Sequence, residues 1–155
     1  MQQSQLKGQY SCNLSGVKSV LMLFCNNPLS PSEADIDYQE EYTAATSCDL
    51  FEAVLIDLDA LVNENDARKA VRKVPTADSE KTAIYRGWMM RPAHYKELYH
   101  ALKGKNIKLI NTPEQYKNAH HLSEWYQSVE KFTAKSVWIS PKDFYFKFNA
   151  VKEQL

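Results

Sequence analysis

Short apolar runs alternate with longer polar segments along this chain of 155 residues. The apolar runs have the length of buried strands and lie at residues 17–25, 52–58, 81–86, 106–111 and 135–140. The segments between them favour helices at residues 32–48, 63–74, 91–103, from 112 onward and at 123–132. This alternation predicts an α/β fold: a Rossmann-like open, mostly parallel sheet of four to five strands with flanking helices.

Three helix ends carry recognisable signals. Ser32 is a candidate N-cap for the first helix, and Asp35 follows three residues later. Thr112 followed by Pro113 and Gln115 predicts a capping box with proline at the first helical position. Gly104 is expected to stop the helix over residues 91–103.

The two ends of the chain differ from the middle. Residues 1–16 are polar and are expected to form a flexible leader, and residues 17–140 form one α/β domain. Residues 141–155 fit a strand, because Phe144, Phe146 and Phe148 alternate, but they also fit a helix that starts at Ser140-Pro141. We favour the helix.

Composition narrows the class of partner. Lysine plus arginine (19) equal aspartate plus glutamate (19), which gives no electrostatic reason to expect nucleic acid or an anionic membrane. The longest apolar run, "VLMLFC", is far too short for a membrane span. Three separated cysteines without a C-x-x-C pair indicate reduced thiols, so we expect a cytoplasmic protein without a disulfide framework or zinc knuckle.

Common catalytic motifs are missing from the sequence. It contains no G-x-G-x-x-G, no P-loop and no G-x-S-x-G. Asp57 and Asp59 follow the second strand and could bind a metal or a ribose, but more often such acids solvate a strand exit and cap the next helix. For His94, His120 and His121, as for Cys25, an ordinary structural role is the first expectation, with a ligand contact or a nucleophile as the alternative.

The strongest local feature is the turn in "AIYRGWMMRPAHYKELYHAL" (83–102). It follows the third strand, at the sheet edge where open α/β folds bind ligands. Gly87 permits close backbone approach or a positive φ, Arg86 can clamp a carboxylate or phosphate, and Trp88 with Met89 offers an adaptable apolar surface. The alternative is that Arg86 pairs with an acid while Trp88 and Met89 fill the core.

Several segments in order, "NNPLSPSEADIDYQEEYTAA", "LIDLDAL", the turn itself, "LINTPEQYKNAHHLSEWY" and "TAKSVWI", resemble one clade of ATP-grasp proteins. That clade is named for a signature of two arginines and a lysine. The resemblance covers residues 17–139 and rests on the combination of "YRGWM", the "LIN-P--Y" stretch and "WY … T-KSVW".

The resemblance implies a fold and a role. ATP-grasp ligases convert a carboxylate to an acylphosphate with ATP, and an amine or another nucleophile then attacks it. This chain resembles their Rossmann-like pre-ATP-grasp domain, which precedes the lobes that hold ATP and magnesium. ATP and magnesium are therefore implied for the full-length family, and no residue of this chain is assigned a catalytic or metal-binding role.

Two hypotheses follow from the resemblance. The first is a substrate-side domain that packs on catalytic ATP-grasp lobes in cis and is not catalytic alone. Its expected substrate-binding residues are Arg86, Gly87, Trp88, Met89, Asn26, Asn27 and Asn111. The second is a standalone, non-enzymatic protein-binding or inhibitor module that has kept the fold and binds a protein partner in trans.

Overall fold

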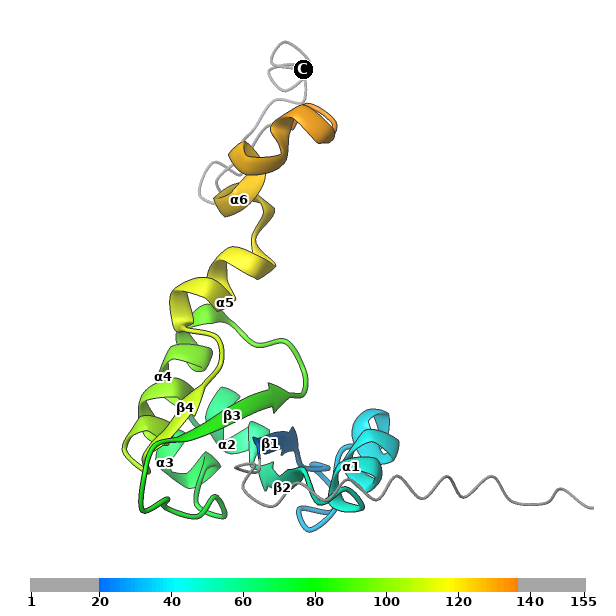
Figure 1. Cartoon of the computed structure of the whole chain (residues 1–155), viewed down its shortest axis with the longest axis vertical. Helices are drawn as coiled ribbons and strands as arrows, with labels where there is room; N and C mark the ends of the chain where they lie inside the picture. Colours follow the sequence, from blue (N-terminus) through cyan, green and yellow to red (C-terminus); the bar gives the residue numbers. More distant parts are fainter. Residues whose placement is uncertain (1–19, 137–155) are drawn as a thin grey trace, which may run out of the picture.

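A four-stranded, all-parallel sheet organises the protein, as the computed structural model shows for residues 20–136 (Figure 1). Its strands are β1 (Val20–Cys25), β2 (Phe51–Ile56), β3 (Lys81–Arg86) and β4 (Ile107–Leu109). Helices flank the sheet, which confirms the expected open α/β class with four strands. The leader over residues 1–16, the tail over 141–155 and nearly all of the fifth strand candidate lie outside the described residues.

The alternation of side chains along β1 divides the core into two layers. Leu21 and Leu23 pack on one face, against residues of α2 (Leu58–Val62), α3 (Ala67–Ala70) and α4 (Pro92–Lys103). Phe24 points to the opposite face and packs with residues of η1 (Ile36–Tyr38) and α1 (Gln39–Thr46). Because successive residues of a strand face opposite sides, a fully apolar β1 indicates a strand covered on both faces.

The strand order β2-β1-β3-β4 sets where a ligand can bind. The chain passes from β1 to β2 on one side and then crosses over to β3 on the other side. Leu23 of β1 is therefore paired with Val54 of β2 and with Tyr85 of β3. In open α/β sheets the crevice for a ligand lies at such a reversal, outside the carboxyl ends of the two strands.

Two predicted helix boundaries are wrong. The first helix begins after Asp35, not Ser32, because Ala34 forms an antiparallel bridge with Asn26 and the Asp35 amide donates to the Cys25 carbonyl. These bonds keep the backbone extended up to Asp35, whose side chain then accepts from the Asp37 amide.

The helix expected over residues 63–74 is much shorter than predicted. Within that range the helix is α3 (Ala67–Ala70), and a separate helix, α2 (Leu58–Val62), lies before it. α2 begins directly after Asp57, and α3 follows a turn in which Asn65 has a φ of 54°. A side chain in this left-handed conformation interrupts a helix, and asparagine tolerates it better than most residues.

α4 matches its predicted range and ends at Lys103, directly before Gly104. Gly104 itself is right-handed, with a φ of −63°. The left-handed residue of this connection is Asn106, whose φ is 59°. The helix therefore stops where the sequence indicates, but the reversal into β4 is made two residues later.

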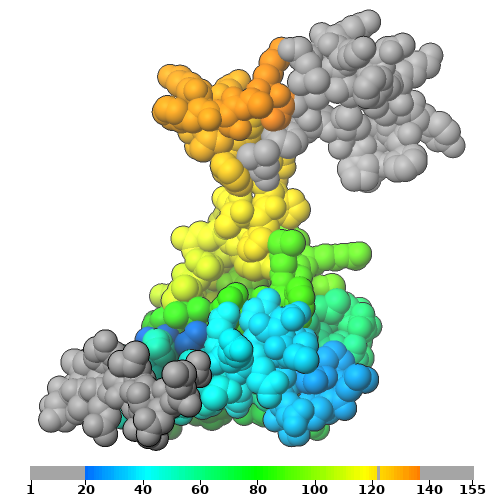
Figure 2. All heavy atoms as spheres, turned by 90° about the vertical axis from the view of Figure 1, so that its right-hand side faces the viewer, coloured from blue at the N-terminus to red at the C-terminus, as the bar shows by residue number. Residues whose placement is uncertain are grey.

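α5 (Pro113–His120) and α6 (Leu122–Val129) rise away from the sheet (Figure 1) and form an arm, seen as a narrow column in Figure 2. The predicted capping box is confirmed: the Gln115 amide donates to Thr112 Oγ1, and the Thr112 amide donates to Gln115 Oε1. α6 leads into η2 (Glu130–Phe132). A bilayer-spanning helix would need more length and apolarity than any helix in residues 20–136 has.

Candidate functional site

Three loops meet at the reversal between β1 and β3 and enclose a cleft of about 620 Å³. They follow β1, β2 and β3, as expected for the carboxyl edge of a parallel sheet. The β1 loop, α2 with the turn after it, and the β3–α4 connection each contribute side chains. These residues are Asn26, Pro28, Asp35, Leu58, Asp59, Val62, Asn63, Asn65, Trp88, Met89, Met90, Arg91 and His94.

Gly87 supports this edge by allowing close approach. A Cβ at residue 87 would overlap Cys25 Sγ and would lie 2.8 Å from the Tyr85 hydroxyl. The Tyr85 hydroxyl donates to the Trp88 carbonyl at 2.6 Å and lies 3.2 Å from Cys25 Sγ. Of the two reasons considered for this glycine, close packing is therefore the one that applies.

Burial gives Cys25 a structural role. Its side chain is fully buried, and this desolvation raises the pKa of the thiol. The pKa of Tyr85 is also raised, chiefly by burial and then by the neighbouring Cys25. A thiol that resists ionisation is a poor nucleophile, so the expectation of a small buried hydrophobe describes Cys25 well.

Arg86 turns away from the cleft toward α1. Its Nε and Nη2 donate to the two carboxylate oxygens of Glu41 at 2.5 and 2.6 Å, and its guanidinium lies 5.1 Å from the Tyr38 ring centroid. The hydrogen bond from Arg86 lowers the pKa of Glu41, and the bond to Glu41 raises the pKa of Arg86. Arg86 thus has the acidic partner that the alternative interpretation of the turn required.

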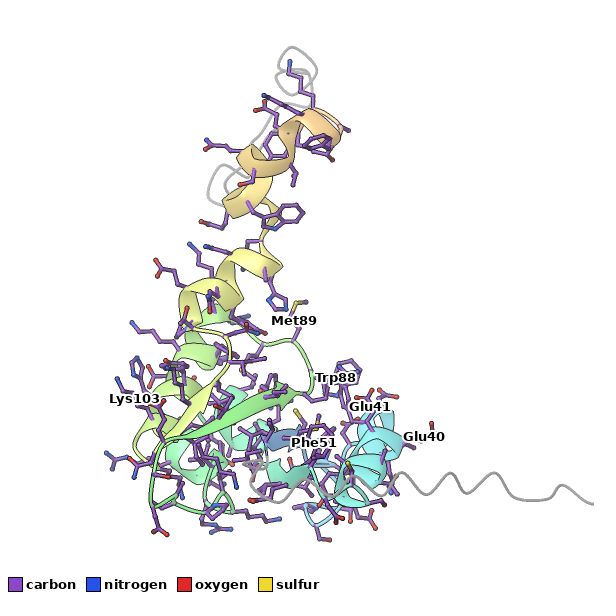
Figure 3. The ribbon with its side chains drawn as sticks, in the orientation of Figure 1. Glu40, Glu41, Phe51, Trp88, Met89 and Lys103 are labelled. Carbon is purple, nitrogen blue, oxygen red and sulfur yellow. The ribbon has the colours of Figure 1, made fainter. Side chains whose placement is uncertain are left out.

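Trp88 and Met89 lie on the surface rather than in the core. Trp88 is 45% exposed and Met89 is 71% exposed, whereas Met90 is buried. The Trp88 ring meets the Tyr38 ring edge-on at 5.7 Å, beside Glu41 of α1 (Figure 3). Met89 lies further along the same loop, on the side of α5 (Figure 3). Both side chains line the cleft.

The three predicted asparagines lie in different settings. Asn26 is buried at the cleft, where its Oδ1 accepts from the Leu58 amide at 3.3 Å. Asn27 stabilises its own loop, because its Oδ1 accepts from the Leu29 amide. Asn111 lies two residues beyond the end of β4 and does not line the cleft.

A second, smaller cavity of about 180 Å³ lies among β3, α4 and α5. Gly87, Met89 and Asn111 contribute to its lining, together with Tyr116, whose ring stacks on Tyr95 at 3.8 Å. The predicted residues are therefore divided: Asn26 and Trp88 belong to the larger cleft, Gly87 and Asn111 belong to the smaller cavity, and Met89 borders both.

The acids after β2 have the structural roles expected of them. Asp57 caps α2 by accepting from the Ala60 amide at 3.0 Å, and Asp59 accepts from Asn63 Nδ2 at 2.6 Å. Within residues 20–136, no group of three or more His, Cys, Asp or Glu side chains is arranged to hold a metal ion.

Sequence reasoning missed several residues of the cleft. Asp35, Asn63, Asn65 and Arg91 line it, and none was singled out as a ligand contact. The signal that could have found them is topological. Once β1 and β3 are recognised as the strands on either side of the reversal, the three loops after β1, β2 and β3 are expected to meet.

Comparison of the chain with protein-family models, with curated proteins and with solved structures finds no match. The ATP-grasp resemblance therefore stays a prediction from the sequence motifs. The fold and the cleft stand on the structure itself.

Proposed function

We propose that this chain is the substrate-side, pre-ATP-grasp domain of an ATP-dependent carboxylate–amine ligase. In this proposal the acceptor substrate binds in the cleft between the β1 and β3 loops, and the domain packs on catalytic lobes that carry ATP and magnesium. The chain is not catalytic alone.

One observation carries the proposal. Trp88 and Met89 of the "YRGWM" turn, one of the segments on whose combination the resemblance rests, line the cleft at the reversal of strand order. That is the part of an open α/β sheet where ligands bind. Its Trp88 is available to a ligand on the exposed side of the ring and is braced by Tyr38 on the other.

The test supplies the catalytic ATP-grasp lobes to this chain, in cis or in trans, and measures ADP release as a function of amine concentration. We expect amine-dependent ADP release that falls about tenfold or more in Trp88→Ala, which removes about 1.4 kcal/mol or more of binding or transition-state stabilisation. Leu29→Ala is the matched control, because Leu29 is 96% exposed in the neighbouring loop. Equal loss in both variants, or no loss in either, contradicts the proposal.

A second candidate is a non-enzymatic protein-binding or inhibitor module. It is favoured by large apolar side chains on the arm and on η2, which follows it: Trp125 of α6 is 38% exposed and Phe132 of η2 is 89% exposed. Calorimetry with ATP and magnesium on this chain, beside isolation of a stoichiometric complex, separates the two. A defined complex that survives Trp88→Ala but not Phe132→Ser supports the module.

A further inference from the structure

The charged side chains around the cleft come from different segments of the chain and, among the described residues, are not paired with one another. Asp35 and Asp59 lie on the walls formed by the β1 loop and α2, and Arg91 lies on the wall formed by the β3–α4 connection. In the part of the chain from 20 to 136, none of the three forms a salt bridge. Opposite charges held apart around one cavity match a ligand that carries both signs.

The acidic wall has unused acceptor capacity. Asp35 accepts one backbone amide with Oδ1, and Asp59 accepts one amide from Asn63, also with Oδ1. An ionised carboxylate has about four lone-pair sites, so each can accept further hydrogen bonds. Such a wall suits an ammonium group, which is a donor only.

The β3–α4 connection offers donors. Arg91 is exposed and occupies the N-cap position of α4 without a side-chain capping bond. Its guanidinium can bind a carboxylate with two parallel hydrogen bonds, and the helix start adds a favourable field. His94 follows in the first turn, and its Nδ1 is buried with no hydrogen-bond partner among residues 20–136. A buried polar atom left unpaired is rare and calls for a partner.

Between the charged groups the cleft has an apolar part beside the side chains of Asn26, Asn63 and Asn65. Leu58, Val62 and Met90 are buried or half-buried, and Trp88 and Met89 add exposed apolar surface. Small-molecule sites commonly combine such a lining with a few placed polar groups. The volume of about 620 Å³ accommodates a molecule larger than one amino acid.

We infer that the cleft binds a zwitterion, namely an α-amino acid with an apolar side chain or a short peptide that presents such a residue. The ammonium group lies toward Asp35 and Asp59, the carboxylate lies toward Arg91 and the start of α4, and the side chain lies along Trp88 and Met90. This inference names the acceptor class of the proposed ligase and in that sense rests on the proposed function.

The test uses ligands that differ by one charge. L-Leucine is titrated into the full ¹⁵N-labelled chain beside 4-methylpentanoate, which lacks the ammonium group, and 3-methylbutylamine, which lacks the carboxylate. L-Methionine and L-phenylalanine extend the set to other apolar side chains. We expect saturable shifts at Asn26, His94 and the Trp88 indole with the amino acids, and at least tenfold weaker binding of both leucine analogues.

Two variants report the two charges separately. Arg91→Gln should weaken the binding of leucine at least tenfold while leaving the affinity for 3-methylbutylamine unchanged. Asp59→Asn should weaken the binding of leucine while leaving the affinity for 4-methylpentanoate unchanged. The substitution keeps an oxygen that can accept the hydrogen bond from Asn63. Lys96→Gln, on the exposed side of the same helix, is the control.

Three outcomes would overturn the inference: equal affinity for leucine and its two analogues, chemical-shift changes outside the cleft, or no saturable change with any of the three amino acids. These outcomes are separable from failure of the ligase proposal. Binding of leucine without ADP release on addition of the catalytic lobes overturns only the ligase. If ADP release depends on a simple alkylamine as strongly as on an amino acid, the inference of a zwitterionic ligand is overturned but the ligase proposal is not.

Discussion

At the scale of single residues, the close contact of Gly87 with its neighbours leaves no space for a larger side chain. Gly87 lies against Cys25 and Tyr85, and these side chains occupy the space that a Cβ would need. The Tyr85 hydroxyl also donates to the Trp88 carbonyl, so a half-buried side chain packed on the core positions the backbone that carries the exposed indole. Packing in the core therefore determines the position of this wall of the cleft.

Substitution of Gly87 by alanine should destabilise the fold by about 1–3 kcal/mol, as overpacking of a tight core does. Urea denaturation of the variant measures the loss. Cys25→Ala in the same chain should recover part of it, because the sulfur is the atom that the new Cβ meets first.

Gly104→Ala is the matched control for that experiment. Its φ of −63° is right-handed, and the nearest atom to an added Cβ is 3.4 Å away. Alanine in this setting should leave stability unchanged or raise it by about 0.4–1 kcal/mol. A similar loss at both glycines would contradict the role given to the Gly87 contact.

Stability should fall at alkaline pH because Cys25, Tyr85 and Tyr95 keep their protons longer in the folded state. Burial raises the pKa of Cys25 above its ordinary value of 9.0 and raises that of Tyr95 to about 12. The unfolded chain then binds fewer protons than the folded chain, so the free energy of unfolding decreases as pH rises above about 9.

The slope can reach about 1.4 kcal/mol per pH unit for each group that is ionised only when unfolded. Urea denaturation between pH 7 and pH 10.5 measures it. Tyr85→Phe should make the alkaline slope shallower, whatever its effect on stability at pH 7. An unchanged slope in Tyr85→Phe would show that Tyr85 titrates alike in both states.

At the scale of elements, local signals and distant contacts decided different boundaries. The strands and α4 follow from apolar runs and helical spacing, and the α5 capping box is contained in four consecutive residues. The Ser32 prediction was wrong because the backbone after β1 is held extended by a bridge to Asn26. The partner of Arg86 is 45 residues away, so no local pattern could choose between a ligand and Glu41.

The Arg86–Glu41 pair should contribute little to stability despite its two-pronged geometry. Both side chains are 45% exposed, and water screens such a pair. A double-mutant cycle with Arg86→Gln and Glu41→Gln should give a coupling energy of about 0.2–1 kcal/mol that decreases with salt. A coupling above about 2 kcal/mol would assign the pair a larger structural role.

Thr112→Ala should destabilise the protein by about 1 kcal/mol, since it removes the acceptor for the Gln115 amide at the start of α5. Thr43→Ala is the control, because Thr43 lies within α1 and its hydroxyl donates to the Gln39 carbonyl of the same helix rather than capping a helix start. Thermal unfolding of both variants distinguishes the loss of a cap from a general effect of replacing threonine.

At the scale of the whole molecule, the sheet and the arm differ in how much they bury. β1 lies between two strands and between two helical layers, whereas α6 packs on α5 and η2 among the described elements. Backbone amides of α6 should therefore exchange with deuterium faster than those of β1. Equal protection in both would indicate that the arm unfolds only with the sheet.

The central position of β1 also has a consequence for synthesis. β1 leaves the ribosome long before its second neighbour, since Cys25 and Tyr85 are separated by 60 residues. At about 5–20 residues per second, one edge of β1 waits about 3–12 s for β3. Once β2 has been made, β1 and β2 can form an apolar pair with one open edge, so a pause in translation before residue 86 would expose the nascent chain to aggregation at the edge that later supports the cleft.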